Sequence, residues 1–391
     1  MRKKLKEVCD FYSGTGFPVK YQGEDNGELP FYKVGDIANN ATAGNIYLSL
    51  CNNFISYGIA KEIRGTIIPA DVVVFAKIGE ALKLNRRAIT SCDCLIDNNA
   101  MGIGGKSEYL NSMYFYFFMK NLKMETLAES TTVPSVRKTK LEEIEMEVPA
   151  LEEQSKIVNI VAILQKVINE RQEQLAKLNE LIKARFVEMF GDVATGNYKY
   201  EIHKLGDVAE VGSSHRVFTT EFVDEGIPFY RGTEIGELAS GQKPSNPYYI
   251  SVEHYKRLAN DDTKPKVGDL LMPSICNKGQ VWMVDTEKPF YYKDGRVLCI
   301  SPDRDVFDSR YLQYFMRVKT EVEYPKMGSG STFAEFKIFL LKDFDVLIPP
   351  KSVQEEFSKF VEQVDKSKVV VKKALDEAQL LFDSLMQEYF G

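Results

Sequence analysis

The stretch that decides the fold is residues 151–191, whose sequence is LEEQSKIVNIVAILQKVINERQEQLAKLNELIKARFVEMFG. It contains no proline, and its single glycine is its last residue. Apolar side chains recur along it at alternating spacings of three and four residues, which is typical of a helix that buries one stripe against a partner helix. The sequence therefore predicts a helix of about 39 residues, which would span roughly 58 Å at about 1.5 Å per residue.

A second stretch with the same character, residues 351–391, begins about 200 residues after the first, and this offset organises the entire chain. Short segments match in both halves, and their common order is stronger evidence than any single match. The matching pairs are Lys4-Leu5 and Lys204-Leu205, Leu29-Pro30-Phe31-Tyr32 and Ile227-Pro228-Phe229-Tyr230, Asp71-Val72-Val73 and Asp269-Leu270-Leu271, Leu141 and Leu341, Gln154 and Gln354, and Phe190-Gly191 and Phe390-Gly391. The chain is therefore predicted to be an internal repeat.

Each repeat begins with about 150 residues of a different kind. Short β-branched and aromatic runs alternate there with glycine and proline, and one helical segment follows them, at residues 109–123 or 309–322. We predict an α+β fold with two similar globular domains, 1–150 and 192–350, and two helical spacers, 151–191 and 351–391. If the second spacer returns along the first, the chain is a pseudo-twofold object with an antiparallel coiled coil.

The predicted seam of this coiled coil comes from the apolar positions of both spacers. Its residues are Leu164, Ile168, Leu175, Leu178 and Ile182 in the first spacer and Val364, Val371, Leu375, Phe382 and Leu385 in the second. Ser352 and Glu355 predict a capping box at the start of the second helix. A simpler alternative stays open, in which two amphipathic helices each lie on their own domain.

The composition excludes several classes of protein. With 44% hydrophobic and 27% charged residues, and no apolar run near the roughly 18 residues of a membrane span, the chain is expected to be globular without a membrane partner. No apolar leader follows MRKKLKEVCDFY, which favours the cytoplasm. The six cysteines lack C-x-x-C spacing, and Cys92 and Cys94 are expected to be buried on one face of a strand, so no metal is predicted.

The net charge of −6 counts against a free-standing nucleic-acid binder, because such proteins usually carry a basic excess. The objection weakens if basic residues gather on a few loops, or if partner subunits supply most phosphate contacts. Two similar domains at a fixed separation suit a split DNA target, since symmetric binders place their half-sites about one helical turn, roughly 34 Å, or a multiple apart. Because the two domains differ in sequence, the two half-sites should differ as well.

The chain resembles a known family, the specificity (S) subunits of type I restriction-modification systems, over nearly all of its 391 residues. The resemblance rests on the Leu29 to Lys33 and Ile227 to Arg231 segments, Gly268-Asp269, the elements at Ser130 and Gly330, Val148-Pro149 and Ile348-Pro349, and Leu151 to Gln154. It implies two target-recognition domains that read double-stranded DNA, and helical regions that dock two methyltransferase (M) subunits, which restriction (R) subunits join. It also implies that this chain is no enzyme and holds no cofactor, with S-adenosylmethionine and ATP carried by partner subunits.

Direct reading of base edges needs paired donors and acceptors on loops, chiefly Arg or Lys for guanine and Asn or Gln for adenine. Candidates of this kind follow the central strand of each domain. They are Lys77, Lys83, Asn85, Arg86 and Arg87 in the first domain and Ser274, Asn277, Lys278 and Gln280 in the second. A solvated turn with ordinary charges explains each cluster about as well.

Candidate phosphate contacts come from a loop rich in Ser and Thr that recurs in both halves, as sequence-independent contacts should. They are Ser130, Thr131, Thr132, Ser135, Arg137 and Lys138 in the first half and Ser329, Ser331, Thr332 and Lys337 in the second. Lys33 and Arg231 are further candidates because each follows a Phe-Tyr pair. The Phe-Tyr pair itself is predicted to lie in the core.

Two other functions stay open as alternatives. A self-contained DNA adenine methyltransferase is suggested by Asn246-Pro247-Tyr248-Tyr249, although the second proline of the Asn-Pro-Pro-Tyr loop is missing. The segment from Ala100 to Ser107 resembles a phosphate-binding loop, yet Ala100 replaces its first glycine, and a tight turn is the better interpretation. The second alternative is a coiled-coil adaptor without sequence preference.

Overall fold

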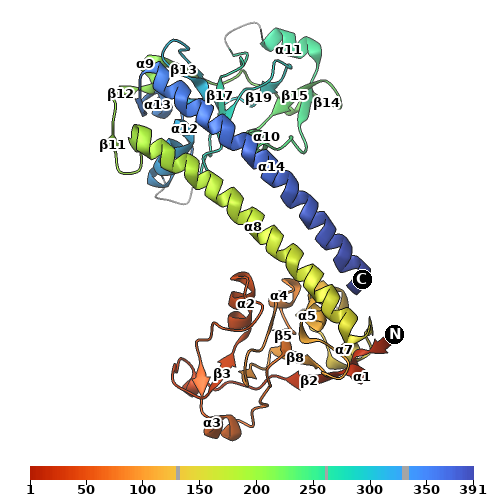
Figure 1. Cartoon of the computed structure of the whole chain (residues 1–391). Coiled ribbons are helices and arrows are strands. Elements are labelled where there is room, and N and C mark those ends of the chain that lie inside the picture. Colours follow the sequence, from red (N-terminus) through yellow and green to blue (C-terminus); the bar gives the residue numbers. More distant parts are fainter. Residues whose placement is uncertain (129–132, 260–262, 328–333) are drawn as a thin grey trace. The chain divides into compact units, whose positions relative to one another are not determined.

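The computed structural model describes residues 1–128, 133–259, 263–327 and 334–391 (Figure 1). The described chain forms two compact units, each with its own core. Unit 1 comprises Met1–Glu173 and Lys372–Gly391, and unit 2 comprises Gln174–Val371. The long helices α8 (Leu151–Phe190) and α14 (Lys351–Phe390), of 40 residues each, contribute one half to each unit.

Unit 1 is built on a four-stranded antiparallel sheet and a smaller three-stranded sheet. The four-stranded order is β2 (Cys9–Ser13), β8 (Ala100–Gly105), β5 (Val72–Ala76) and β6 (Arg87–Ile89). The three-stranded order is β4 (Phe54–Ile55), β3 (Leu29–Tyr32) and β7 (Leu95–Ile96), and β1 (Arg2–Lys4) pairs with β9 (Glu145–Glu147). The short helices are α1 (Leu5–Val8), α2 (Val34–Thr42), α3 (Tyr57–Glu62), α4 (Glu80–Lys83), α5 (Ser112–Asn121), α6 (Met124–Leu127) and α7 (Lys138–Glu142), with a 3-10 turn, η1, at Val19–Tyr21.

Unit 2 repeats this plan. Its main sheet has the order β13 (Ala209–Gly212), β20 (Val297–Pro302), β17 (Leu270–Pro273) and β18 (Trp282–Met283). Its second sheet has the order β14 (Phe222–Val223), β16 (Tyr248–Ile250), β15 (Ile227–Tyr230) and β19 (Tyr291–Tyr292), and the further pairs are β12 (Ile202–Lys204) with β21 (Asp345–Leu347) and β10 (Gly191–Asp192) with β11 (Asn197–Tyr198). The short helices are α9 (Leu205–Val208), α10 (Gly232–Ala239), α11 (Val252–Leu258), α12 (Ser309–Glu323) and α13 (Ile338–Lys342), with 3-10 turns η2 (Thr219–Glu221) and η3 (Tyr324–Met327). The internal repeat is therefore confirmed at the level of strand order.

The two long helices run antiparallel, as predicted. In unit 1 the first half of α8 shares a core with the last half of α14, through Ile168 and Phe382 among others. In unit 2 the last half of α8 shares a core with the first half of α14, through Ile182 and Val364. Each helix thus packs in both units, so the alternative of two helices on separate domains is wrong.

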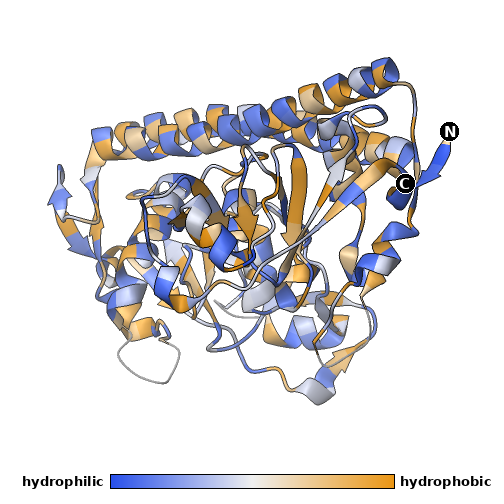
Figure 2. Cartoon of the chain, turned by 90° about the horizontal axis from the view of Figure 1, so that it is seen from below, coloured by the Kyte–Doolittle hydropathy of each residue, from blue (hydrophilic) through white to orange (hydrophobic). Residues whose placement is uncertain are grey.

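All ten predicted seam residues are buried or half-buried in the structure. Figure 2 shows apolar and polar residues alternating along the long helical segment, the pattern expected when one stripe is covered and the rest faces solvent. A polar contact adds to the seam in unit 2, where Arg185 Nη2 of α8 donates to Glu356 Oε1 of α14 at 2.7 Å.

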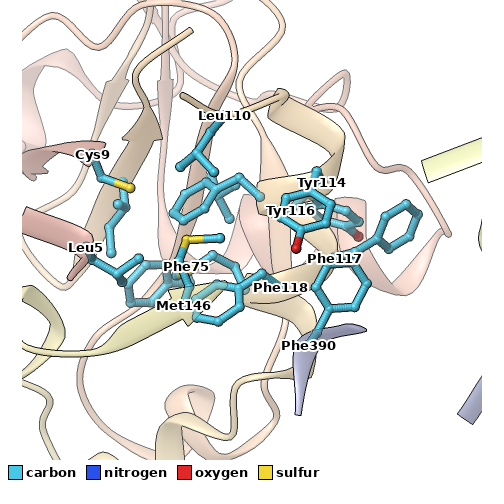
Figure 3. Close-up of a cluster of buried hydrophobic side chains, with 14 of the residues drawn as sticks. Leu5, Cys9, Phe75, Leu110, Tyr114, Tyr116, Phe117, Phe118, Met146 and Phe390 are labelled. Carbon is cyan, nitrogen blue, oxygen red and sulfur yellow. The ribbon is translucent and has the colours of Figure 1, made fainter. Parts of the chain in front are cut away.

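An aromatic residue at the end of each long helix closes the core of a unit. In unit 1 the Phe390 ring lies beside the Tyr114 ring of α5 (Figure 3), at a centroid distance of 5.0 Å. The Asn121 side-chain amide donates to the Phe390 carbonyl oxygen at 3.0 Å. In unit 2 the Phe190 ring lies 4.8 Å from the Tyr311 ring of α12. The repeated Phe-Gly of the sequence therefore marks the same packing position twice.

A buried glutamine fixes the start of each long helix. The Gln154 side chain accepts from Asn111 N at 2.8 Å, and its amide donates to the carbonyl oxygens of Tyr109 and Pro149. Gln354 makes the corresponding bonds to Asp308 N, Val306 and Pro349 in unit 2. The predicted capping box at residues 352 and 355 is wrong, because α14 already begins at residue 351.

The repeat alignment needs a correction of one residue at the start of the central strand. Asp71 has a φ of 65° and Gly268 a φ of 87°, and each opens the same backbone turn. Asp71 N donates to Thr90 O at 2.9 Å, just as Gly268 N donates to Val284 O at 2.7 Å. Asp71 therefore corresponds to Gly268, whereas the sequence comparison paired it with Asp269.

Two further interpretations of local sequence are corrected. The segment that resembled a phosphate-binding loop is strand β8, and an added Cβ at Gly102 would lie 2.9 Å from a Val72 methyl group, so the glycines there allow close packing. Cys92 lies in a bend and is exposed, whereas Cys94 is buried, because the strand begins only at Leu95.

Within the described ranges, no helix carries an apolar run of the length that a bilayer requires. Over the same ranges, no group of three or more His, Cys, Asp or Glu side chains is placed to hold a metal ion.

Candidate nucleic-acid interface

The structure brings the two predicted clusters of the first domain together. The segment that follows β5 runs beside residues 133–136, because Gly79 N donates to Pro134 O at 2.8 Å and Val136 N donates to Lys77 O at 2.9 Å. Lys77 N in turn donates to Asn99 O at 2.9 Å. We call residues 77–87 and 133–138, together with Asn99, the paired loops of unit 1.

The same backbone framework recurs in unit 2. Phe336 N donates to Ser274 O at 2.8 Å, and Ser274 N donates to Arg296 O at 2.8 Å. Residues 274–280 and 334–337, together with Arg296, are therefore the paired loops of unit 2. The backbone bonds are common to both units while the side chains differ, which is the arrangement that two reading surfaces with different specificities require.

The basic side chains of the unit 1 loops differ in their exposure to solvent and in their acidic neighbours. Lys83 and Lys138 are exposed, and each has an acidic neighbour on its own helix, at 2.8 Å in Glu80 and 3.5 Å in Glu142. Arg137 is also exposed, and Lys77 and Arg86 are half-buried. All five remain on the paired loops, so they stay candidates for contact.

Two candidates of unit 1 have structural roles that the sequence does not reveal. Asn85 has a φ of 53°, and its side chain accepts from Arg87 Nη2 at 2.7 Å and donates to Lys120 O at 3.2 Å. Arg87 is only 3% exposed, and its Nη2 also donates to Leu122 O at 2.6 Å. A side chain buried to this degree cannot enter a DNA groove, so the prediction that Arg87 reads a base edge is wrong.

The unit 2 candidates divide in the same way. Asn277 and Lys278 are exposed, and Gln280 fixes their turn by donating to Asn277 Oδ1 at 3.3 Å and accepting from Lys278 N at 3.0 Å. Ser274 is 2% exposed, so its hydroxyl does not reach solvent and the prediction for its side chain is wrong. Lys337 is exposed and donates to Glu335 Oε2 at 2.7 Å.

Several candidates in the Ser/Thr-rich loops lie outside the described residues. They are Ser130, Thr131, Thr132, Ser329, Ser331 and Thr332. Ser135 is described and half-buried, and its backbone bridges Ile78.

Lys33 and Arg231 stand at the starts of α2 and α10. Arg231 N and its guanidinium both donate to the buried Glu234 carboxylate, and the guanidinium lies 4.3 Å from the Tyr248 ring. Burial by itself raises the pKa of Glu234, but the hydrogen bonds from Arg231 outweigh it and hold the pKa below its usual value. Lys33 Nζ donates to Gln22 Oε1. These contacts give both residues a local structural role, and the Phe31 and Phe229 rings are buried in the core as predicted.

Sequence reasoning missed the position that immediately precedes β8 and β20. Asn99 occupies it in unit 1 and Arg296 in unit 2, and both residues are exposed. Their carbonyl oxygens accept equivalent backbone hydrogen bonds, from Lys77 N and from Ser274 N. Arg296 also pairs with Glu335. The available signal was the turn-forming sequence before each strand, DNNA in one half and DGRV in the other.

Nearly the whole chain is similar to known proteins. The model of the type I restriction modification DNA specificity domain matches residues 1–183 and 197–378. The chain is 23% identical over 421 residues to the type I restriction enzyme MjaIX specificity subunit of Methanocaldococcus jannaschii, covering 99% of this chain and 93% of that protein.

Two solved structures share the fold. The S subunit of a type I restriction-modification system from M. genitalium aligns with a TM-score of 0.56 and 13% identity, covering 100% of this chain and 96% of that one. A chain from a structure concerning complex assembly and conformational transition of a type I R-M system aligns with a TM-score of 0.61 and 18% identity, covering 100% and 97%.

Proposed function

The chain belongs to the family of type I restriction modification DNA specificity domains, and from this we propose that it reads an asymmetric DNA target made of two half-sites separated by a gap. Each unit reads one half-site through its paired loops. The chain catalyses no reaction itself, because specificity subunits leave catalysis to their partner subunits.

One observation carries the proposal: equivalent positions on the same backbone framework hold side chains of different reading chemistry. Asn99 in unit 1 offers the amide pair that suits adenine, and Arg296 in unit 2 offers the two parallel donors that suit guanine. A common framework with unlike readers predicts two unlike half-sites.

We propose the remaining roles from what is expected of this family. The helical regions dock two methyltransferase subunits, and restriction subunits join the complex in the cytoplasm. S-adenosylmethionine and ATP are bound by those partners, so the purified chain should not bind S-adenosylmethionine in a calorimetric titration. Binding by the chain alone would favour the alternative of a self-contained methyltransferase.

The direct test is a selection from random duplex DNA with the chain and its methyltransferase partner. We expect an enriched motif of two parts with a fixed gap, and no enriched motif would favour an adaptor without sequence preference. Asn99→Ala should relax one position of one half-site and Arg296→Ala one position of the other, each at a cost of about 1–3 kcal/mol in discrimination. Relaxation of both half-sites by either variant would contradict the assignment of one half-site to each unit.

The long helices provide a second test, because they are proposed to set the gap. Inserting one heptad into both α8 and α14 lengthens each by about 10 Å, roughly three base-pair steps. The gap should lengthen, or binding should be lost, while the half-site bases stay unchanged. Altered half-site bases would refute this role of the helices.

A further inference from the structure

A cavity of about 280 Å³ in unit 1 has lining chemistry that the proposed function does not yet use. It lies between the end of α2, strand β6, helix α5 and helix α8. Arg86, Arg87 and Lys120 line it together with the amides of Asn45 and Asn169, and no Asp or Glu is among its described lining residues.

The most buried of these polar residues, Arg87, has hydrogen-bond donors that no described residue satisfies. Arg87 is 3% exposed, and within the described part of the chain its Nε and Nη1 have no hydrogen-bond partner. Only Nη2 is satisfied, by Asn85 Oδ1 and Leu122 O. Since a guanidinium keeps its charge under almost all conditions, a buried one with two idle donors is unfavourable until an anion lies beside it.

The neighbouring charges reinforce this demand. Burial lowers the pKa of the Arg87 guanidinium below its usual range, and loss of hydration followed by the charge of Arg87 lowers the pKa of Lys120. The shift of Lys120 shows in addition that it lies close enough to Arg87 for the two positive charges to interact. An oxyanion in the cavity would be held by Arg86 and Lys120 at the rim and by Arg87 beneath them.

Among its described residues, unit 2 has no cavity with this lining, and the difference bears on the ligand. In unit 1, Phe75 of the central strand β5 pairs with Arg87. The counterpart of Phe75 in unit 2 is Met272, which follows Leu271, and Leu271 pairs with Trp282. Val281, one residue before β18, therefore takes the sheet position of Arg87. The related cavity of unit 2 is lined by Arg310, Arg317 and Lys368, but also by the carboxylates of Glu321 and Asp365. Identical partner subunits that presented a carboxylate to both units would require equivalent sites, so the different lining of the unit 2 cavity argues against a carboxylate of such a partner as the ligand.

We propose that this cavity is a subsite for a phosphate oxyanion and that, in the DNA complex, it holds a backbone phosphate beside the paired loops of unit 1. Its Asn85–Arg87 wall is part of those loops. The identification of DNA as the source of the phosphate rests on the proposed function. The preference for an oxyanion rests only on the chemistry of the cavity. The contact is sequence-independent, so it positions the duplex without selecting bases.

The first experiment uses the full chain with inorganic phosphate, compared with chloride at equal ionic strength. Phosphate should raise the melting temperature of the wild-type chain, and Lys120→Gln and Arg87→Gln should reduce that rise. Lys120 is exposed, so its substitution does not depend on whether the buried Arg87 variant folds. Lys61→Gln is the matched control, because it removes the same charge from exposed surface of unit 1 outside the cavity. An undiminished rise in Lys120→Gln and in a folded Arg87→Gln overturns the subsite.

The second experiment measures duplex binding by the chain and its methyltransferase partner over a range of salt concentration. Lys120→Gln should reduce the slope of log affinity against log salt by about 0.9, the value for one lost phosphate contact, and by the same amount on a selected and an unrelated duplex. Lys61→Gln should leave the slope unchanged.

The outcomes separate the sources of the anion. An unchanged slope in Lys120→Gln overturns the assignment to DNA, and weaker binding of the methyltransferase partner with an unchanged slope identifies a protein carboxylate instead. If the slope falls as expected but random DNA yields no motif, the subsite stands and sequence reading fails. Failure of this proposal and failure of the proposed function are therefore distinguishable.

Discussion

Replacing Phe390 by alanine should loosen unit 1, and the matching replacement of Phe190 should loosen unit 2. Both residues end a long helix and close a core from the same packing position. The Phe390 ring contacts the rings of Tyr114 and Phe117, at centroid distances of 5.0 and 6.4 Å. Neither substitution removes the hydrogen bond from the Asn121 side-chain amide to the Phe390 carbonyl oxygen.

The magnitude follows from burial. Truncating a buried phenylalanine to alanine costs about 3–5 kcal/mol, because apolar area is lost and a cavity remains. Phe390 is 7% exposed whereas Phe190 is fully buried, so we expect the lower end of this range for Phe390→Ala and the upper end for Phe190→Ala. A loss of about 3 kcal/mol raises the equilibrium constant for local opening roughly a hundredfold.

Amide hydrogen exchange measures the effect in each unit separately. Phe390→Ala should accelerate exchange in α5, residues 112–121, by roughly a hundredfold and leave α12, residues 309–323, nearly unchanged. Phe190→Ala should produce the opposite pattern. Acceleration of both helices to the same extent by either variant would refute the reasoning, because it would mean that the two cores do not open independently.

Three further predictions concern single residues. Asp71→Gly should stabilise the chain by up to about 1 kcal/mol in urea unfolding, since glycine relieves the left-handed backbone at φ 65°, and a destabilised variant would contradict this. Gln154→Leu should cost about 1–3 kcal/mol by leaving Asn111 N and two carbonyl oxygens without partners, with the exposed Gln363→Leu as a neutral control. Hydrogen bonds from Lys4 and then Lys6 lower the pKa of Glu143 to about 2. The ionised Glu143 carboxylate therefore contributes to the free energy of unfolding above the ordinary carboxyl pKa of about 4.3, and this contribution disappears as the pH falls toward 2. The difference in urea midpoint between wild type and Glu143→Gln should therefore be constant from pH 7 to about 5 and vanish near pH 2, and a difference that persists at pH 2 would contradict the assignment.

The architecture could be predicted because it is encoded by periodicity and repetition. The long helices follow from apolar spacing without interruption by glycine or proline, and the repeat follows from matches in a common order. The single residue of misalignment at Asp71 arose because two different residues, aspartate and glycine, satisfy the same left-handed turn. A comparison of residue types alone does not reveal which residues share a backbone dihedral angle.

The candidate interface was predictable only in part, for a related reason. The paired loops are joined by backbone bonds, such as Val136 N to Lys77 O, and these leave no trace in the side-chain pattern. Arg87 has the composition of a surface loop residue, yet it belongs to strand β6 and points into the interior. The cavity that it lines draws on four segments of the chain, so no local motif could indicate it.

The acidic net charge is compatible with DNA binding once the distribution of charge is considered. In unit 2 Glu335 pairs with both Arg296 and Lys337, so these two basic groups of the paired loops share one carboxylate. Residue 135, which precedes Val136 as residue 335 precedes Phe336, is a serine in unit 1, and the cavity beside those loops has no described carboxylate. Under the proposed function, unit 1 should therefore attract phosphate more strongly than unit 2, and unit 2 should depend more on hydrogen bonds to base edges. It follows that the salt dependence of binding should be set mainly by unit 1, even though both units contribute to the choice of sequence.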